Sequence, residues 1–332
     1  MPKFSIILPV RNGSNYIREC IDSILSQTYT SFELLILENA STDNTVEIIN
    51  SFGDERIKII PAERPLTIEE NWARAVEIPK AEYMTLIGHD DILQPNFLEI
   101  INGLIKTHPD ATLYHTHFSF IDSKGKYIRD CKPMKQVQTP KEVILNYIGI
   151  KADLMGTGFI MRSAQYEEVG GIPLYKNLLF ADMELVIELS LLGYFAVSSF
   201  KCFSYRLHEN ATTSSSSLDR YIEGFDRLIT YLKNLKLKYQ DLKNSIEISS
   251  KTLLNKCGEY IIIKMIETTK PGENNLRVEN FINYLEKQSF LLCPDNYSPR
   301  NNCKIQIANI IQKHQILHTF FLKVRNKNPF KR

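Results

Sequence analysis

The first 110 residues alternate short apolar runs with amphipathic segments, and this alternation constrains the fold more than any other feature of the sequence. The apolar runs cover residues 4–10, 32–37, 56–60 and 82–87. The segments between them carry apolar residues at helical spacing, as Ile17, Ile21 and Ile24 do in the first one. Short, continuous apolar runs are typical of strands that are buried on both faces. The alternation therefore predicts an α/β fold, with a mostly parallel sheet and helices on both of its faces.

The pattern is less regular between Thr112 and the middle of the chain. Residues 122–125 predict a hairpin turn, and residues 182–192 predict a helix. Residues 194–197 and 202–205 predict two further short strands. These shorter elements indicate a second half of the same domain, built differently from the first.

Beyond Leu218 the sequence is helical and rich in Lys, Asn and Leu. We therefore expect one domain over residues 1–215 and a helical C-terminal region with a basic tail over residues 216–332. The tail combines basic and aromatic residues, which is typical both of a solvated terminus and of a segment that lies on an anionic membrane surface.

Composition excludes several classes of protein. The 332 residues carry a net charge of only +2, so there is no strong global field for nucleic acid and we expect no nucleic-acid partner. None of the six cysteines has CxxC spacing, so neither a zinc site nor a redox motif is indicated. The N-terminal stretch MPKFSIILPV lacks a secretory pattern, and no stretch approaches the ~20 apolar residues of a membrane span. We expect a soluble, cytoplasmic protein with reduced cysteines.

Polar residues follow three of the predicted strands, at residues 9–12, 38–39 and 88–91. Because the carboxyl ends of parallel strands meet at one edge of a sheet, these residues are expected to form one site. In the third group, Asp90 and Asp91 are adjacent carboxylates, which repel each other unless a positive group neutralises them. A hard divalent cation can do this and can also bind phosphate oxygens. The alternative is that one of the two aspartates only caps a turn before the next helix.

Six stretches of the sequence, in order, resemble motifs of one enzyme family. They are Pro9–Asn12 (PVRN), Ser23–Tyr29 (SILSQTY), Glu38–Thr45 (ENASTDNT), residues 70–93 (ENWARAVEIPKAEYMTLIGHDDIL), residues 180–197 (FADMELVIELSLLGYFAV) and residues 205–214 (YRLHENATTS). The family is family 2 of the inverting glycosyltransferases, of the bacterial surface-polysaccharide type. The resemblance covers roughly residues 3–217.

This resemblance implies a GT-A (Rossmann-like) fold with a mostly parallel central sheet and flanking helices. It divides the domain into a nucleotide-binding half, about residues 1–110, and an acceptor-binding half, about residues 111–215. It also implies an activity: a metal-dependent, inverting transfer of a sugar from a nucleotide-diphosphate donor to a hydroxyl of a glycan or lipid-linked oligosaccharide. The cofactor is expected to be Mn²⁺ or Mg²⁺, and the setting lipopolysaccharide or capsule biosynthesis in a bacterium, on the inner face of the cytoplasmic membrane.

The resemblance assigns the catalytic and metal-binding roles residue by residue. Asp182 matches the general base, although by position alone it could be the N-cap of its helix. The predicted metal ligands are Asp90, Asp91 and His208. The sequence departs from the family pattern at two positions: Gly88 replaces the first Asp of the metal motif, and Ala181 replaces the Glu that usually precedes the base.

The predicted nucleotide-binding residues are Pro9, Val10, Arg11, Asn12, Glu38, Asn39, Asn71, His89 and Asp90. Asn39 stands where the family commonly has an aspartate that reads a pyrimidine edge, and Arg11 stands where a tyrosine commonly packs on the base. An amide both donates and accepts, and a guanidinium can also stack, so a pyrimidine diphosphate donor is still favoured.

Two other functions and one other partner remain open at this stage. A degenerate family member would bind nucleotide or glycan without turnover, and Gly88, Asn39 and Ala181 favour it. A nucleotidyltransferase shares the α/β layout but needs a better Gly-rich basic loop than residues 11–13 provide. A nicotinamide-dependent oxidoreductase is disfavoured because no GxGxxG follows a strand. The helical region could also mediate a homo-oligomer.

Overall fold

The computed structural model describes residues 1–153, 155–209, 216–271, 277–293 and 297–327. The chain forms two compact units. The α/β unit comprises Met1–Val143 and Lys151–Ser216, and the helical unit comprises Ile144–Ile150 and Ser217–Arg332. Each unit has its own core of buried apolar side chains.

The α/β unit is built on a ten-stranded sheet. Its strands are β1 (Phe4–Val10), β2 (Phe32–Glu38), β3 (Ile57–Pro61), β4 (Tyr83–Leu86), β5 (Ile92–Leu93), β6 (Leu113–Ile121), β7 (Tyr127–Asp130), β8 (Val137–Gln138), β9 (Ile160–Arg162) and β10 (Phe195–Arg206). The order across the sheet is β3-β2-β1-β4-β9-β6-β10-β5, with β7 added to β6 and β8 to β10. β3, β2, β1 and β4 pair in parallel, as do β6 and β10, whereas β9 runs antiparallel between the two groups. The predicted mostly parallel sheet is confirmed.

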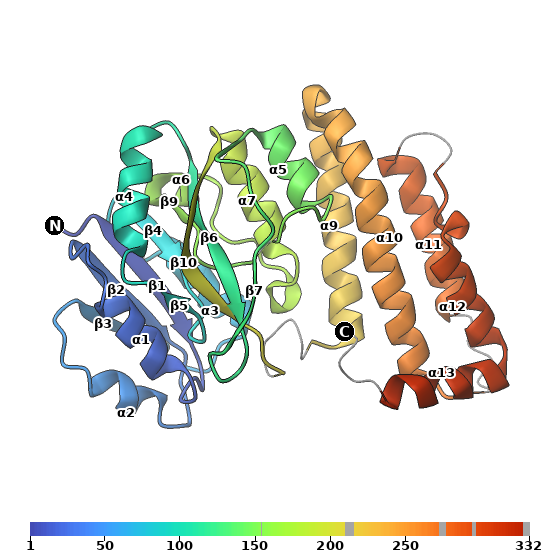
Figure 1. The fold of residues 1–332 in the computed structure, drawn as a ribbon, viewed down its shortest axis with the longest axis horizontal. Coiled ribbons are helices and arrows are strands. Elements are labelled where there is room, and N and C mark those ends of the chain that lie inside the picture. Colours follow the sequence, from blue (N-terminus) through green and yellow to red (C-terminus); the bar gives the residue numbers. More distant parts are fainter. Residues whose placement is uncertain (154, 210–215, 272–276, 294–296, 328–332) are drawn as a thin grey trace. The chain divides into compact units, whose positions relative to one another are not determined.

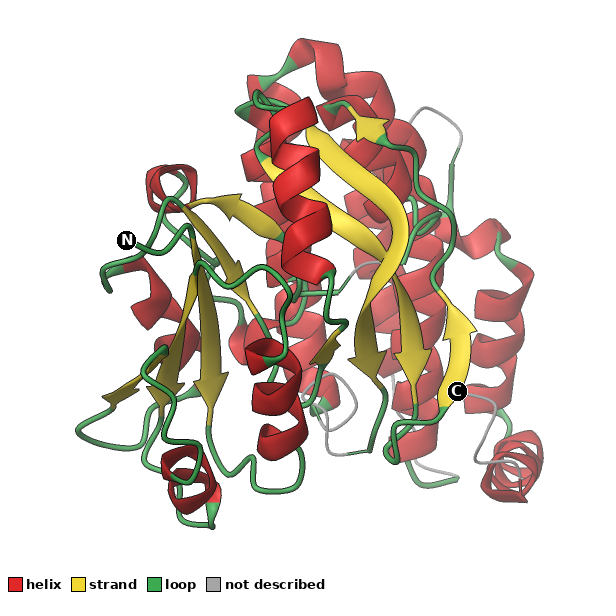
Figure 2. Cartoon of the chain, turned by 60° about the vertical axis from the view of Figure 1, so that its left-hand side comes forward, coloured by secondary structure: helices red, strands yellow, loops and turns green. Residues whose placement is uncertain are grey.

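Helices cover both faces of this sheet (Figure 2). They are α1 (Ile17–Leu25), α2 (Thr45–Asn50), α3 (Ile68–Ala73), α4 (Phe97–Thr107), α6 (Ser163–Glu168) and α7 (Ala181–Leu191), with short 3₁₀ turns η1 (Arg74–Val76) and η2 (Lys176–Leu178). α5 (Pro140–Tyr147) links the two units in the chain. α3 begins with a capping box: the Thr67 hydroxyl accepts from the Glu70 N–H, and the Glu70 carboxylate accepts from the Thr67 N–H.

The core explains why the first strands have continuous apolar sequences. All seven residues of β1 and all seven of β2 are buried, because helices cover both faces of these central strands. Phe4, Ile6 and Leu8 of β1 join Ile17 and Ile21 of α1 in one buried cluster. Burial of such side chains contributes about 25 cal/mol per Å² and fixes the strand ends that carry the polar residues.

The structure differs from the sequence-based prediction at one element. The two short strands expected at residues 194–197 and 202–205 are one strand, β10, whose register against β6 shifts near Lys201. The middle of this strand is exposed, so its polar residues interrupt the apolar pattern without interrupting the backbone pairing. Pro95 directly precedes Asn96, the N-cap of α4.

The helical unit contains five long helices and two 3₁₀ turns among its described residues. They are α9 (Leu218–Lys238), η3 (Gln240–Leu242), α10 (Lys243–Thr268), α11 (Arg277–Leu292), η4 (Pro299–Asn301), α12 (Cys303–Lys313) and α13 (Gln315–Lys327). α9, α10 and α11 run side by side (Figure 1). Among the described residues, no helix combines the length and apolar character that crossing a bilayer requires.

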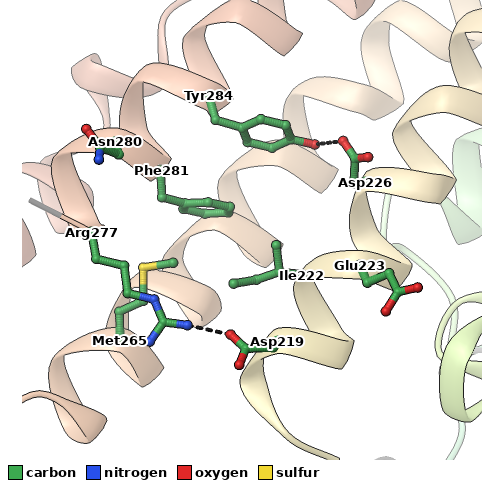
Figure 3. A pocket seen from close by; sticks show the side chains of 9 residues that line it. All are labelled: Asp219, Ile222, Glu223, Asp226, Met265, Arg277, Asn280, Phe281 and Tyr284. Carbon is green, nitrogen blue, oxygen red and sulfur yellow. Dashed lines mark hydrogen bonds and ion pairs between the residues drawn. The ribbon is translucent and has the colours of Figure 1, made fainter.

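Polar side chains tie α9 to α11 across an open pocket of the helical unit (Figure 3). Arg277 donates to Asp219 at 2.5 Å at one end, and the Tyr284 hydroxyl donates to Asp226 at 2.6 Å at the other. Phe281 packs between these two interactions, with its ring stacked on Tyr284. The pocket walls are therefore held by interactions between helices of this unit.

Candidate active site

The carboxyl ends of β1, β2 and β4 lie next to one another at one edge of the sheet. Val10 pairs with Glu38 at the ends of β1 and β2, and Ile7 pairs with Leu86 at the end of β4. The N–H of Asn39 donates to the carbonyl of Val10 at 3.0 Å, which continues the pairing by one residue. The polar residues that follow these three strands are therefore brought together, as parallel pairing requires.

The loops after β1 and β2 are fixed to each other by polar contacts. The Glu38 carboxylate accepts from the N–H groups of Ala40 at 3.1 Å and Ser41 at 2.7 Å. Asn12 accepts from the Thr42 N–H at 2.8 Å through its side chain, and its own N–H donates to the Ser41 hydroxyl at 3.0 Å. Asn12 and Ala40 have positive φ angles of 52° and 48°, a conformation that needs such support in residues other than glycine. Glu38 is buried and acts here as a loop anchor.

Asn39 has both faces of its amide occupied by one peptide segment. Its side-chain oxygen accepts from the Leu66 N–H at 2.7 Å, and its side-chain nitrogen donates to the Leu66 carbonyl at 3.1 Å. The side chain is buried. Asn39 can therefore contact a nucleobase only if the segment around Leu66 moves. The prediction that Asn39 reads the base stays a prediction, with this contact as a competing interaction.

Asn71 is also engaged within the protein. Its side-chain nitrogen donates to the Leu37 carbonyl at 3.1 Å, and its oxygen accepts from Arg74 at 2.9 Å. Pro9 and Val10 are buried in β1, where only their backbone can contribute to a site. The predicted nucleotide-binding residues that remain exposed or partly exposed are Arg11, Asn12, His89 and Asp90.

The Gly88–Asp91 turn holds its two carboxylates in different environments. Asp91 is 1% exposed, and its oxygens accept from the Thr157 hydroxyl at 2.7 Å and from the Arg206 N–H at 3.1 Å. Burial, and next the charge of Asp90, raise the pKa of Asp91 well above its ordinary value. These contacts give Asp91 the role of a support for the turn.

Asp90 is more open and points toward a histidine. Its Oδ2 lies 2.7 Å from Nε2 of His208, and the His208 ring packs against Tyr16 with centroids 5.1 Å apart. Burial opposes ionisation of Asp90, but the hydrogen bond with His208 and the proximity of His89 outweigh it and lower the pKa of the Asp90 carboxyl. Asp90 is therefore an anion at neutral pH.

Two glycines make room for this arrangement. A Cβ atom at Gly88 would lie 2.6 Å from the Asp90 carboxylate, so a side chain at position 88 would displace Asp90 from its present place. A Cβ atom at Gly13 would lie 2.7 Å from the His89 ring, so the chain after β1 approaches His89 closely. Burial lowers the pKa of His89, which therefore presents a neutral imidazole to the site.

Arg206 stabilises the Gly88–Asp91 turn through hydrogen bonds from its buried guanidinium and its backbone N–H. It is 2% exposed, donates to the Asp90 carbonyl at 2.7 Å and to the Glu19 carboxylate at 2.6 Å, and lies over the Tyr16 ring at 4.7 Å. The structure gives it a carboxylate partner and leaves it almost no exposed surface.

We expect Arg206→Met to lower the free energy of unfolding by about 2–4 kcal/mol, because it removes several hydrogen bonds to a buried guanidinium. Urea unfolding followed by circular dichroism measures this change. Arg162→Met is a matched control, since Arg162 pairs with Glu82 at 2.7 Å on a more exposed surface and should cost less than about 1 kcal/mol. Equal losses for the two variants would contradict a supporting role for Arg206.

Asp182 lies in the first turn of α7 and is not its N-cap. The N-cap is Phe180, which has a positive φ of 71°, and Asp182 is the second residue of the helix. Its carboxylate accepts from the Met183 N–H at 3.0 Å and has no other side-chain partner among the described residues. Apolar side chains, including Leu86 and Phe159, line the adjacent small cavity. Burial raises the pKa of Asp182 to about 6.

The turn at Gly156 and Thr157, just before β9, lies between Asp182 and Asp91 and contacts both. A Cβ atom at Gly156 would lie 3.7 Å from that of Asp182, and the next residue, Thr157, donates to Asp91. Burial, and then the charges of Asp91, Asp90 and Asp182, raise the pKa of Tyr205 on β10. Asp182 and the Gly88–Asp91 turn therefore belong to one site.

The described residues contain no cluster of three or more His, Cys, Asp and Glu side chains arranged to hold a metal ion. The two atoms that could ligate a metal, Oδ2 of Asp90 and Nε2 of His208, are 2.7 Å apart. This distance is close to the spacing of two neighbouring ligand atoms on one ion. Mn²⁺ and Mg²⁺ accept such sparse protein ligation when water and substrate phosphates complete the shell. The pair fits a divalent cation held jointly with a diphosphate, whereas Asp91 is occupied by Thr157 and Arg206.

Some site residues gave no signal in the sequence. Tyr16 lies far from Asp90 along the chain and belongs to no chemical motif. Glu69 accepts from the Asn177 N–H at 2.6 Å and so ties α3 to the turn that precedes Asp182, where Asn177 has a positive φ of 54°. Only the approach of these segments in space identifies such supporting residues.

The family model and four relatives that match this chain are all described as glycosyltransferases. The model of a family described as "Glycosyl transferase family 2" matches residues 5–170, half of the chain. An uncharacterized glycosyltransferase of Rickettsia prowazekii is 29% identical over 241 residues, which is 70% of this chain and 73% of the relative. Glycosyltransferase GlyG of Streptococcus pneumoniae is 26% identical over 125 residues, 37% of this chain and 42% of the relative. The match spans only 28% and 53% of the lengths of two glycosyltransferases from Rickettsia felis and Rickettsia typhi.

Two solved structures resemble the fold over almost the whole chain. The crystal structure of residues 1–349 of TarS from S. aureus, in complex with UDP-GlcNAc, has a TM-score of 0.68 at 17% identity and covers 99% of this chain and 93% of that one. The mannosyltransferase PcManGT from Pyrobaculum calidifontis, in complex with GDP-Man and Mn²⁺, has a TM-score of 0.52 at 12% identity and covers 97% and 87%. At these identities the likeness concerns the fold.

Proposed function

Because this chain belongs to glycosyl transferase family 2, we propose that it transfers a sugar from a nucleoside-diphosphate donor to a hydroxyl group of a glycan or lipid-linked acceptor, with inversion at the anomeric carbon. The observation that carries the proposal is the connection of Asp182 to the Gly88–Asp91 turn through Gly156 and Thr157. It sets an accessible anion, Asp90, and a carboxyl of raised pKa, Asp182, in one site.

Asp182 has the properties of a general base. Its pKa of about 6 leaves it ionised at neutral pH while making it more basic than an ordinary carboxylate. In an inverting transfer, a single base takes the proton of the acceptor hydroxyl as its oxygen attacks the anomeric carbon from the side opposite the diphosphate. The bond to the acceptor oxygen forms as the bond to the diphosphate oxygen breaks. The apolar wall beside Asp182 keeps its carboxylate poorly solvated and ready to accept a proton.

Asp90 and His208 are the residues that would hold Mn²⁺ or Mg²⁺. Such a cation neutralises charge on the departing diphosphate. Asp91, Thr157 and Arg206 position this pair by fixing the turn on which Asp90 sits. We propose His89, whose pKa is lowered by burial, as a neutral contact for the donor ribose or sugar.

The donor is proposed to carry a pyrimidine base, with Arg11 stacked on it and the backbone near Asn12 beside it. Support comes from TarS, whose structures contain UDP-GlcNAc or UDP. The structure of PcManGT contains GDP-Man, so a purine donor is the alternative. The acceptor is proposed to belong to a bacterial surface polysaccharide, such as lipopolysaccharide or capsule, and the reaction to take place in the cytoplasm at the inner face of the membrane.

Isothermal titration of UDP, dTDP, CDP and GDP, each with and without Mn²⁺, tests this proposal. We expect one nucleotide to bind at least about tenfold more tightly with Mn²⁺ than without it, because the cation joins the diphosphate to Asp90 and His208. Adding the matching nucleotide sugar and an acceptor glycan should then release that nucleoside diphosphate. If none of the four nucleotides binds with either Mn²⁺ or Mg²⁺, the result contradicts the proposed donor site.

The alternative is a member of the family that binds donor or glycan without turnover. The occupation of Asn39 by Leu66 is the observation in its favour, since a base-reading side chain is committed to a protein contact. A variant of Asp182 separates the two functions, because only the enzyme needs its carboxylate.

A further inference from the structure

The two units of this chain carry opposite net charges. Residues 217–332 of the helical unit hold 20 Lys and Arg against 11 Asp and Glu, a net charge of +9. The remaining residues hold 20 basic against 27 acidic side chains, a net charge of −7. The balanced total of +2 therefore conceals a strongly basic helical unit. Such an asymmetry within one chain is typical of a protein with one basic binding surface.

Two polar side chains of α13, those of His318 and Arg325, point into the helical unit. His318 is buried, with Nε2 2.8 Å from the Ile266 carbonyl, and Arg325 donates to Glu267 at 2.5 Å. Ile316 is 84% exposed and Phe320 is 66% exposed. A helix that only packs on its own protein normally buries its apolar face, so this orientation leaves an apolar face for another partner.

The exposed apolar face extends from α13 onto α12. Ile316, Phe320 and Val324 are four residues apart and therefore lie on one side of α13. Ile307 and Ile310, each more than half exposed, are three residues apart on α12. The groove between the two helices has Ile310, Ile316 and Leu317 in its walls. We call these residues of α12 and α13 the α12–α13 face (Figure 1).

Basic side chains accompany this face. Lys313 lines the same groove, Lys323 is exposed between Phe320 and Val324, and Lys304 stands at the start of α12. Lys304 and Lys313 pair with Glu259 and Glu279, yet their side chains remain 62% and 58% exposed. No Asp or Glu follows residue 295 in the sequence. Apolar side chains beside exposed lysines match the boundary between the headgroups and acyl chains of an anionic bilayer.

We propose that the α12–α13 face docks the protein on an anionic lipid membrane. Phe320, Ile316 and their apolar neighbours enter the upper acyl region, and the lysines lie at the level of the lipid phosphates. The main competing occupant is a second copy of the chain. It is disfavoured because two such faces would bring together helical units that each carry a net charge of +9.

Sedimentation of the full chain with lipid vesicles tests the proposal. We expect binding to phosphatidylglycerol-containing vesicles at low salt, and much weaker binding to pure phosphatidylcholine or at high salt. Replacing both Ile316→Ser and Phe320→Ser should weaken binding by about tenfold or more, because it removes the apolar insertion. The matched control is Ile128→Ser with Phe200→Ser, which removes exposed apolar side chains from the acidic α/β unit and should leave binding unchanged.

Three results would overturn the proposal. One is an absence of binding to anionic vesicles by the unmodified chain. The second is an equal loss of binding in the two double variants. The third is a dimer, seen by analytical ultracentrifugation, that the Ile316→Ser and Phe320→Ser changes dissociate. None of these results bears on nucleotide binding by the α/β unit, so the proposed function is tested separately.

Discussion

Asp182→Asn lowers the rate of sugar transfer by about 10²–10⁴-fold while leaving donor binding within about twofold, if Asp182 is the general base. The amide has nearly the same shape as the carboxylate but cannot accept the acceptor's proton. Among the described residues, the carboxylate accepts one hydrogen bond from another residue, from the Met183 N–H, and an amide oxygen can accept it too. The measurement is single-turnover transfer with the nucleotide sugar identified by titration. Transfer at an unchanged rate would contradict the assignment of the base.

The raised pKa of Asp182 adds a second readout. In the unmodified protein, transfer should rise with pH through about 6, since only the ionised carboxylate accepts a proton. Folding favours the protonated form, because the folded pKa of about 6 exceeds the unfolded value of ~3.9. The stability associated with that proton is present below about pH 4 and is lost as the pH rises toward 6.

Asp182→Asn should therefore stabilise the fold at pH 8, by about 1–3 kcal/mol, and change it little near pH 4. Glu188→Gln, on the same helix, is the control for loss of a carboxylate from α7 and should leave transfer intact. A variant that is inactive and less stable at pH 8 would instead indicate a structural role for Asp182. A variant that binds donor and is more stable, but inactive, supports the enzyme over a non-catalytic binder.

The fold could be predicted from the sequence where burial is simple. β1 and β2 are buried on both faces, so their apolar runs matched the observed strands within one residue. The sheet order and the similarity to solved GT-A glycosyltransferases confirm the predicted fold class. β10 was mistaken for two strands because its exposed middle carries polar residues while its backbone still pairs with β6.

The candidate site could be predicted only in part, because a motif does not say which way a side chain faces. The sequence placed Glu38 and Asn39 beside the nucleotide, but these side chains hold the N–H of Ser41 and the peptide of Leu66. The partners of Asp91 come from Thr157 and Arg206, more than sixty residues away. Contacts over such separations depend on the packing of the whole sheet, which local patterns do not encode.

The departure at Gly88 also has a physical meaning that the sequence alone did not supply. The Asp90 carboxylate occupies the space that a side chain at position 88 would need. The turn has therefore kept one accessible carboxylate, Asp90, and paired it with His208. This arrangement concentrates the proposed metal binding on two residues, and so makes it vulnerable to single substitutions.

Asp90→Ala should weaken donor binding in Mn²⁺ by about 10–100-fold and change it little without the metal, because Asp90 is proposed to hold the cation that meets the diphosphate. His208→Ala should act in the same direction. If both side chains hold one ion, the double variant should bind the donor in Mn²⁺ about as tightly as the single variant of lower affinity does. Removing either ligand already disrupts the site. Titration calorimetry with and without Mn²⁺ measures all four proteins.

Thr157→Val is the matched control for damage to the turn. It removes the hydroxyl that donates to Asp91 and keeps Asp90 and His208, so the free energy of unfolding should fall by about 1–3 kcal/mol while the response to Mn²⁺ is retained. If Mn²⁺ still strengthens donor binding to the same extent in Asp90→Ala and in His208→Ala, the pair does not hold the cation. Non-additive losses confined to Mn²⁺ would establish that the two residues act on the donor through one cation.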